Sequence, residues 1–137
     1  MGEIVYKVEN ALDPSEFNKV LIKSTLAERR PVDDYDRIKK MCDNANLIVT
    51  ARIDGKLIGV ARSITDFAYC TYLSDLAVDT KYQNQGIGKK LIEETKRAAP
   101  QAKIILLSAP AAIDYYLKIG MKKNSQCFTL DDISELN

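Results

Sequence analysis

The stretch Gln83-Asn84-Gln85-Gly86-Ile87-Gly88 separates a strand-like run, residues 72–78, from a helix-like run that begins at Lys89. A strand, a glycine-containing turn and a helix start, in that order, form an anion site. The amides of the first helical turn have no partner within the helix, and the helix dipole favours negative charge there. Gly86 and Gly88 carry no Cβ that would block a close approach to the backbone. The sequence therefore predicts that a phosphate group binds at this turn.

The spacing of the glycines excludes two common phosphate-binding motifs. Gln83 stands where a Walker A loop needs its first glycine, and Lys90 stands where it needs Ser or Thr. Leu91 stands where a dinucleotide fingerprint needs its third glycine. An ordinary glycine-containing turn between a strand and a helix remains the alternative. Features elsewhere in the chain are needed to choose between this turn and a phosphate-binding one.

The composition is that of an ordinary globular protein. The chain has 137 residues, 46% hydrophobic and 28% charged, which suits a single domain over residues 1–137. Because the net charge is +1 and the basic residues are scattered, we expect no nucleic-acid partner. No long apolar run or leader-like segment is present, so we expect no membrane contact. Three widely spaced cysteines, Cys42, Cys70 and Cys127, suggest the reducing cytoplasm.

The sequence contains no histidine. This absence excludes catalytic triads that use histidine, Cys-His pairs and histidine-ligated metals, and no Cys-x-x-Cys pair is present. We therefore expect no metal site. Any general acid or base must be a carboxylate, a tyrosine, a lysine, a cysteine or a water molecule.

Hydrophobic periodicity and turn residues predict the element order β-α-α-β-β-β-α-β-α-β. Asp13-Pro14-Ser15-Glu16 predicts a capped first helix, with Glu16 reaching back as in a capping box, that continues to about Leu26. The second helix is expected to place Tyr35, Ile38, Met41 and Cys42 on its inner face. The expected strands are residues 3–8, 46–52, 56–65, 70–78, 103–108 and 127–130. A meander followed by a β-α-β crossover predicts an α/β (α+β) fold, with a mixed central sheet and helices on both faces.

A second motif, Tyr115-Tyr116-Leu117-Lys118-Ile119-Gly120-Met121, follows the glycine turn. Both motifs and the element order resemble the GNAT superfamily of N-acetyltransferases. Gln-x-x-Gly-x-Gly is similar to the family's pyrophosphate loop, and the second motif is similar to its aromatic-Tyr-x-x-x-Gly-Phe segment, with Met121 in place of Phe. The resemblance covers residues 46–121 well and the N-terminal helices more loosely. Residues 59–66 and 108–112 also resemble those of small, single-domain bacterial members.

The resemblance implies acetyl-CoA as the acetyl donor and CoA as the product. The helix start after Gly88 would bind the pyrophosphate, and the pantetheine arm would pair with an exposed strand edge. In the family the strand before the loop splays from the next one, and here these would be residues 76–78 and 103–108. Backbone amides near Val78 would hold the thioester oxygen. The implied cofactor-binding residues are Leu76, Ala77, Val78, Gln83, Asn84, Gln85, Gly86, Ile87, Gly88, Lys89, Ala112 and Tyr116.

By the same resemblance, Tyr116 is the general acid that protonates the CoA sulfur. An ordinary tyrosine pKa of about 10 keeps the phenol protonated at neutral pH. The alternative is a packing role, which is also what we expect for Tyr115. Asp75, in the strand beside the expected splay, is the candidate general base, because burial would raise the pKa of a carboxyl group. Asp75 bonding to loop amides, with a water chain as the base, is the alternative.

The acceptor would lie between the N-terminal helices and the hairpin turn. Its candidate ligands are Arg30, Arg62, Thr65, Asp66 and Tyr69, although Asp66 can equally be a turn residue and Arg30 a helix-end charge. The main hypothesis is an N-acetyltransferase that acts on a primary amine of a small molecule. A protein N-terminus or lysine as acceptor, and a non-catalytic acyl-CoA-binding module, are the alternatives. A homodimer is compatible with these features.

Overall fold

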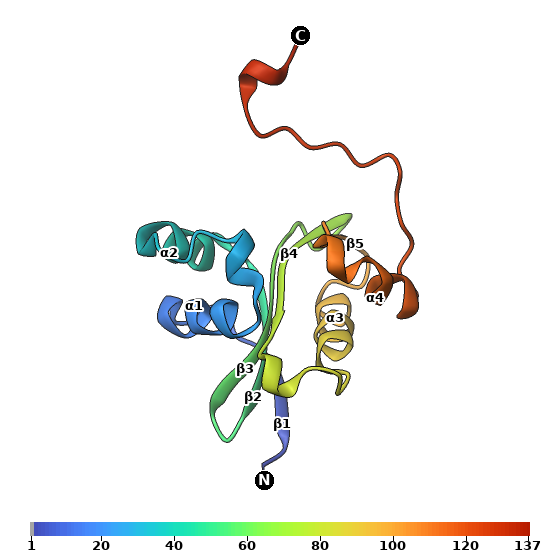
Figure 1. Cartoon of the computed structure of the whole chain (residues 1–137). Coiled ribbons are helices and arrows are strands. Elements are labelled where there is room, and N and C mark those ends of the chain that lie inside the picture. Colours follow the sequence, from blue (N-terminus) through green and yellow to red (C-terminus); the bar gives the residue numbers. More distant parts are fainter. Residues whose placement is uncertain (1) are drawn as a thin grey trace. The chain divides into compact units, whose positions relative to one another are not determined.

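The computed structural model describes residues 2–137 and divides the chain into two compact units. One unit extends to Leu107 and contains the sheet, and the other, Ser108–Asn137, contains the last helix and the C-terminal segment (Figure 1). The expectation of one domain over residues 1–137 stays a prediction. No helix in the described part of the chain has the length and apolar character needed to cross a membrane.

The first unit is built on one five-stranded sheet with the order β1-β2-β3-β4-β5. The first three pairings are antiparallel, and β4 and β5 are parallel, which confirms the predicted mixed sheet. The predicted bounds of β3 and β4 are also confirmed, whereas β5 ends three residues earlier than expected. The strands are β1 Ile4–Val8, β2 Leu47–Ile53, β3 Lys56–Thr65, β4 Cys70–Val78 and β5 Lys103–Ile105.

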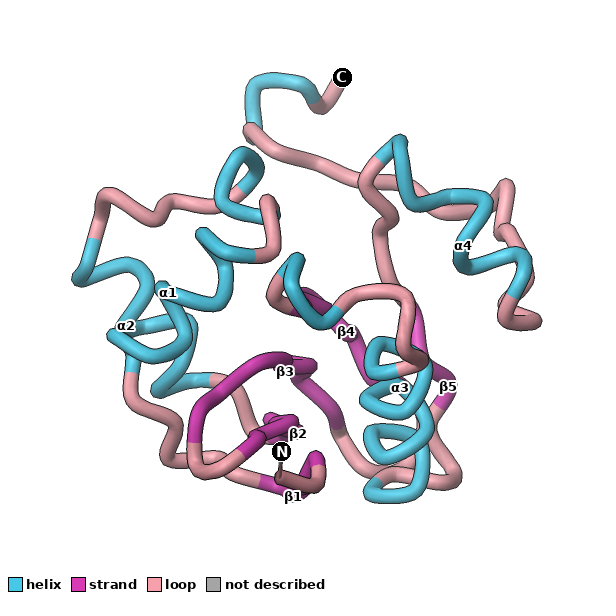
Figure 2. Tube along the Cα trace, turned by 60° about the horizontal axis from the view of Figure 1, so that its bottom comes forward, coloured by secondary structure: helices cyan, strands magenta, loops and turns pink. Residues whose placement is uncertain are grey.

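Helices cover both faces of this sheet (Figures 1 and 2). Helices α1 (Pro14–Lys23) and α2 (Tyr35–Asn44) lie on one face, and α3 (Ile87–Ala98) lies on the other. Ile48 belongs to the buried cluster under α1 and α2, whereas its neighbour Val49 belongs to the cluster under α3. This alternation follows from the two-residue period of a strand. The arrangement confirms the predicted α/β class.

Gly59 determines how closely α3 approaches β3. A Cβ at this position would lie 3.2 Å from Cδ1 of Leu91 and 3.3 Å from Cγ2 of Ile87. Both contacts would be tighter than ordinary packing, so the glycine allows the first turns of α3 to sit against the sheet. The close packing at Gly59 therefore fixes the position of the α3 N-terminus.

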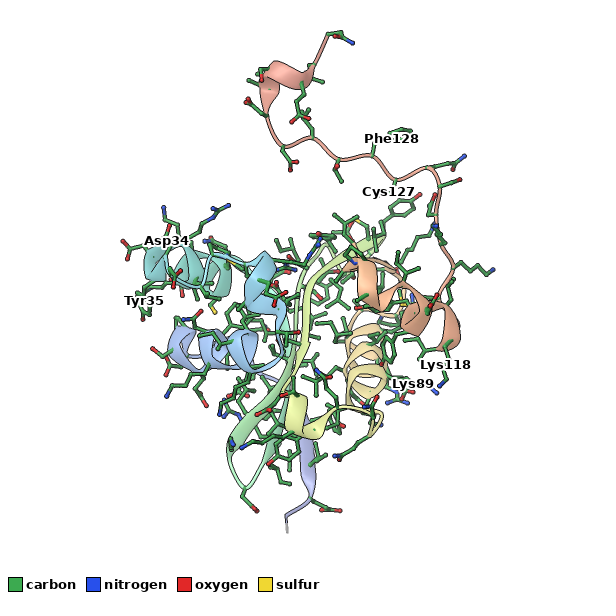
Figure 3. The ribbon with its side chains drawn as sticks, in the orientation of Figure 1. Asp34, Tyr35, Lys89, Lys118, Cys127 and Phe128 are labelled. Carbon is green, nitrogen blue, oxygen red and sulfur yellow. The ribbon has the colours of Figure 1, made fainter. Side chains whose placement is uncertain are left out.

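The N-terminal helices differ from the prediction in three local features. Asp13 caps α1 by accepting a hydrogen bond from the amide of Ser15, but Glu16 forms no capping box, because its carboxylate accepts from Arg52 instead. Helix α1 ends at Lys23, and Thr25 follows with a φ of 74°, which breaks the helix before a 3₁₀ turn at Leu26–Arg29. Tyr35, the first residue of α2, is 51% exposed instead of facing inward (Figure 3).

The second unit contains the 3₁₀ turn Pro110–Ala112, helix α4 (Ile113–Lys118) and a further 3₁₀ turn, Ile133–Glu135. The strand predicted at residues 127–130 is absent from this unit, so that prediction is wrong. A strand needs a hydrogen-bonded neighbour, and this unit contains no other strand. None of its residues is buried, and Phe128 is 89% exposed (Figure 3).

Candidate functional site

The glycine loop leads directly into α3. Gly86 is the N-cap residue, with a φ of +81°, and its carbonyl accepts the first helical hydrogen bond, from the amide of Lys90 at 3.0 Å. No side chain among the described residues caps this helix. A Cβ at Gly86 would meet no atom within 4 Å, so the positive φ, and not space, requires glycine in this structure. The buried Ile87 anchors the loop in the core, while residues 83–86 and Lys89 are exposed (Figure 3).

A side chain connects this loop to the end of β4. Nε2 of Gln83 donates a hydrogen bond of 2.9 Å to the carbonyl of Val78. Between them, the buried Asp79 accepts from the amide of Lys81, and its own amide donates to the carbonyl of Ile58 in β3. The predicted strand end and the predicted loop therefore form one continuous structure. Sequence reasoning did not single out Asp79, although an Asp directly after a strand is a common cap of a following turn.

One edge of β4 is open beside this loop. β5 pairs only with the first three residues of β4, through Cys70 with Lys103, Thr71 with Ile104 and Tyr72 with Ile105. Beyond Tyr72, β4 pairs with β3 on one side and has no strand partner on the other among the described residues. The unpaired amide and carbonyl groups of such an edge can accept an extended ligand as an added strand. The open edge ends where the glycine loop begins.

Asp75 is buried between two arginine side chains, which is not the environment expected of a general base. Its side chain is 0% exposed, and its two carboxylate oxygens accept from Nε of Arg30 and Nε of Arg62. A substrate amine cannot reach a carboxylate that is fully covered in this way. The alternative of bonds to loop amides is not seen either, because the partners are arginine side chains. The geometry corrects the general-base expectation and favours a structural role for Asp75.

The two arginines expected to bind the acceptor are the partners of Asp75. Each uses all three guanidinium nitrogens in hydrogen bonds within the protein. The Arg62 side chain is only 7% exposed and that of Arg30 is 20% exposed. These bonds engage three of the five N–H donors of each guanidinium group, and the geometry favours a structural role over the expected contact with the acceptor.

The remaining acceptor candidates lie at the turn between β3 and β4. Thr65 is buried and its Oγ1 lies 2.7 Å from Oγ1 of Thr71. Asp66 accepts from the amides of Tyr69, Ala68 and Cys70, and these bonds lower the pKa of its carboxyl group. Thr65 and Asp66 therefore build the turn. Tyr69 is 79% exposed, so its side chain is open to a ligand.

The second unit holds Tyr116 on α4. Partial burial raises the pKa of the Tyr116 phenol, and the nearby Tyr115 raises it further. The two rings pack edge to face, with centroids 5.3 Å apart. Tyr116 is therefore protonated at neutral pH, as a general acid must be. Ala112, also expected to contact the cofactor, ends the 3₁₀ turn before α4 and is half-buried.

The Tyr-x-x-x-Gly spacing has a local structural reason. Gly120 follows α4 with a φ of +103°, and its amide donates to the carbonyl of Leu117 at 3.1 Å. The amide of Met121 donates to the carbonyl of Tyr116 at 3.0 Å. These two bonds form a Schellman motif, which ends the helix one turn after Tyr116. The four-residue spacing thus fixes the position of Tyr116 relative to the helix end.

Comparison with curated proteins identifies the family. Residues 9–121 match the model of the Acetyltransferase (GNAT) family. GCN5-related N-acetyltransferase 2, a chloroplastic protein of Arabidopsis thaliana, is 36% identical over 74 residues, or 52% of this chain and 29% of that protein. Glucosamine 6-phosphate N-acetyltransferase 1 of Dictyostelium discoideum is 26% identical over 119 residues, or 80% of this chain and 76% of that protein. A histone acetyltransferase of Glycine max is 34% identical over 74 residues, or 52% of this chain. The match spans only 29% to 32% of the Arabidopsis and soybean proteins.

Solved structures show the same fold. A GNAT family acetyltransferase of Streptococcus pneumoniae TIGR4 superposes with a TM-score of 0.74 at 18% identity, over 98% of this chain and 100% of that one. An aminoglycoside N-acetyltransferase in complex with CoA superposes with a TM-score of 0.73 at 13% identity, over 97% of each chain. Because the family model matches most of the chain and the fold agrees with it, the chain belongs to the GNAT family of acetyltransferases.

Proposed function

We propose that this protein is an N-acetyltransferase that transfers an acetyl group from acetyl-CoA directly to a primary amine of a small molecule. The observation that supports it best is the open edge of β4, which leads into the uncapped N-terminus of α3. Acetyl-CoA has the matching parts in the same order: a thioester, an extended arm with two amides, and a pyrophosphate. The residues present therefore fit this cofactor.

Each part of the site has a role in this proposal. The amides at the start of α3, after the exposed loop of residues 83–86, bind the pyrophosphate. Backbone groups of Leu76, Ala77 and Val78 pair with the arm and orient the thioester, which supplies an acetyl carbon open to attack. Gln83 holds the end of this edge through its bond to the Val78 carbonyl. Lys89, exposed in the first turn of α3, adds positive charge beside the phosphates.

The proton transfers follow from the groups that the chain offers. The acceptor amine attacks the thioester carbon and the C–S bond breaks, and Tyr116 then gives its phenolic proton to the departing sulfur. The proton that leaves the amine passes to water, because the carboxylate of Asp75 is covered by two arginines. Bulk solvent restores the proton of Tyr116. This assignment requires no histidine and no metal ion.

A small-molecule acceptor is favoured by the relative that the chain covers most fully among those described above, which is named for an amino sugar phosphate. A protein amine is the second candidate, because the soybean relative is named a histone acetyltransferase. We further propose a cytoplasmic location, since the three cysteines form no disulfide in the described part of the chain.

The first experiment is calorimetric titration of the purified protein with acetyl-CoA, with ATP and NAD as control ligands. We expect acetyl-CoA to bind and the two controls to bind far more weakly, because only acetyl-CoA has an arm for the β4 edge. Thiol release is then measured with a panel of amino sugars, polyamines and histone peptides. If acetyl-CoA does not bind, the proposed function is wrong. If only peptides are acetylated, the protein-amine alternative is correct.

A further inference from the structure

Ser74 lies just after the point at which the β4 edge opens. In the ladder between β3 and β4, Arg62 pairs with Asp75 and Ser63 pairs with Leu73, so Ser74 is an extra residue that forms a β-bulge. The pairing of β4 with β5 ends at Tyr72, two residues before this bulge. A bulge bends its strand and increases the local twist. The bulge therefore sets the direction in which residues 75–78 continue.

Two arginines hold this bulge from the α1 and α2 side. Nη2 of Arg30 donates to the carbonyl of Ser74 at 2.7 Å, and Nη2 of Arg62 donates to Oγ of Ser74 at 2.9 Å. Nε of each arginine also donates to a different oxygen of Asp75. Because a guanidinium group is planar and its donors point in fixed directions, each arginine fixes Ser74 and Asp75 relative to one another.

The same cluster attaches the bulge to the helical layer. Nη1 of Arg62 donates to the carbonyl of Met41 in α2 at 3.1 Å, and Nη1 of Arg30 donates to the carbonyl of Arg29 at 2.8 Å. Arg30 directly follows the 3₁₀ turn after α1. Burying a carboxylate between two guanidinium groups is costly unless the charged groups are hydrogen-bonded, and here every guanidinium nitrogen and both carboxylate oxygens are engaged. The cluster thus holds a single arrangement of the strand.

We propose that Arg30, Asp75 and Arg62 are positioning residues that keep the β4 edge in the direction required by the arm of acetyl-CoA. This inference rests on the proposed function, because it concerns the cofactor of that reaction. The three residues act through the backbone of β4 and do not touch the cofactor or the acceptor. The pyrophosphate, by contrast, binds to the start of α3, with which the cluster forms no hydrogen bond among the described residues.

The test compares two arginine-to-lysine variants of the full chain. Arg30→Lys keeps a positive charge beside Asp75 but cannot donate to Ser74 in the same geometry. Arg52→Lys is the matched control, because Arg52 also donates with all three nitrogens, to Glu9, Glu16 and Gly55, far along the sheet from the bulge. Melting temperature, acetyl-CoA affinity and affinity for ADP 3′-phosphate, which has the pyrophosphate but no arm, are measured for each.

We expect both variants to lower the melting temperature. Arg30→Lys should weaken acetyl-CoA binding about tenfold, which corresponds to the loss of one or two hydrogen bonds between the arm of acetyl-CoA and β4. Binding of ADP 3′-phosphate should be unchanged. Arg52→Lys should leave both affinities unchanged. Equal acetyl-CoA affinities of the two variants, or equal weakening of both ligands by Arg30→Lys, would overturn the positioning role while the proposed function stands. Failure of the unaltered protein to bind acetyl-CoA would instead overturn the proposed function.

Discussion

At the scale of single residues, two substitutions of Gly86 distinguish the effect of backbone strain from the effect of negative charge at the phosphate site. Its φ of +81° disfavours any side chain, yet a Cβ would meet no neighbour. We expect Gly86→Ala to destabilise the fold by about 1 kcal/mol through strain alone. Gly86→Asp should have a similar cost and should also abolish acetyl-CoA binding, because its carboxylate would repel the pyrophosphate. Chemical denaturation and calorimetry measure the two effects; equal acetyl-CoA affinities of the two variants would contradict the loop assignment.

Tyr116 provides the second residue-scale prediction. Tyr116→Phe should lower kcat about 100-fold, within the range for loss of a general acid, and leave the acetyl-CoA Kd unchanged. Since burial raises the pKa of the phenol above its ordinary 10.0, Tyr116 stays protonated from pH 7 to 9, and any loss of kcat in that range must come from another group. Tyr115→Phe is the control and should retain most activity. Unchanged turnover in Tyr116→Phe would show that another group supplies the proton.

The same residues show what sequence alone can and cannot predict. Asp13 and Gly120 act on backbone groups within a few residues, so local chemistry was enough to place them. Arg30 bonds to a residue 45 positions away, and Arg62 to the same residue 13 positions away. No local pattern signals such a contact. The sequence indicated charged and polar side chains near the strand, and only the fold shows that they bind one another.

At the scale of elements, the contact between α3 and β3 at Gly59 predicts a coupled effect. Gly59→Val would push β-branched atoms against Ile87 and Leu91, whose side chains would lie within 3.3 Å of the new Cβ. We expect a loss of about 1–3 kcal/mol from overpacking, together with weaker acetyl-CoA binding as the start of α3 moves. Denaturant titration and calorimetry measure both. Lower stability with unchanged affinity would show that the helix start does not depend on this contact.

The salt-bridge cluster of Arg52 in β2 with Glu9, directly after β1, and Glu16 in α1 predicts a pH effect. Burial raises the pKa of Glu9, but hydrogen bonds from Arg52 and Thr50 outweigh it, so the net pKa lies below the ordinary 4.5. Glu9 therefore contributes stability above the pKa of the unfolded chain, and this contribution is lost as the pH falls through the folded-state pKa. We expect Glu9→Gln to flatten the decline in stability below about pH 4.5. Melting temperatures of both proteins from pH 3 to 7 provide the measurement, and parallel curves would contradict the assignment.

Element type was easier to predict than element pairing. The turn residues at 54–55 and 66–68 gave the bounds of β3 and the start of β4, because a turn between two antiparallel strands is a local signal. The apolar run after residue 102 suggested a longer strand than β5, since apolar character does not show where pairing stops. The bulge at Ser74 was also missed, because an extra residue in a ladder depends on the partner strand. The open edge was therefore expected only from the family resemblance, at residues 76–78, and the residue at which it begins could not be predicted from local patterns.

At the scale of the whole molecule, the second unit lacks a core of its own. None of the residues Ser108–Asn137 is buried, and its exposed side chains include Phe128, Leu130, Ile133 and Leu136. Residues 127–130 have the apolar character of a strand. No strand forms there, because the unit contains no second strand with which these residues could pair. These apolar side chains find no packing partners within the unit itself.

The proposal of a homodimer, with which the sequence is compatible, can be tested on these side chains. The full chain should therefore elute at twice the mass of a monomer in light-scattering chromatography. A variant with Phe128, Leu130 and Ile133 all changed to Ser should elute as a monomer, because burial of large apolar side chains supplies about 2 kcal/mol each. A matched variant with Lys122, Lys123 and Asn124 changed to Ser should remain dimeric. A monomeric unaltered chain would contradict the proposal, and so would a triple apolar variant that still dimerises, since the dimer would then use a different surface.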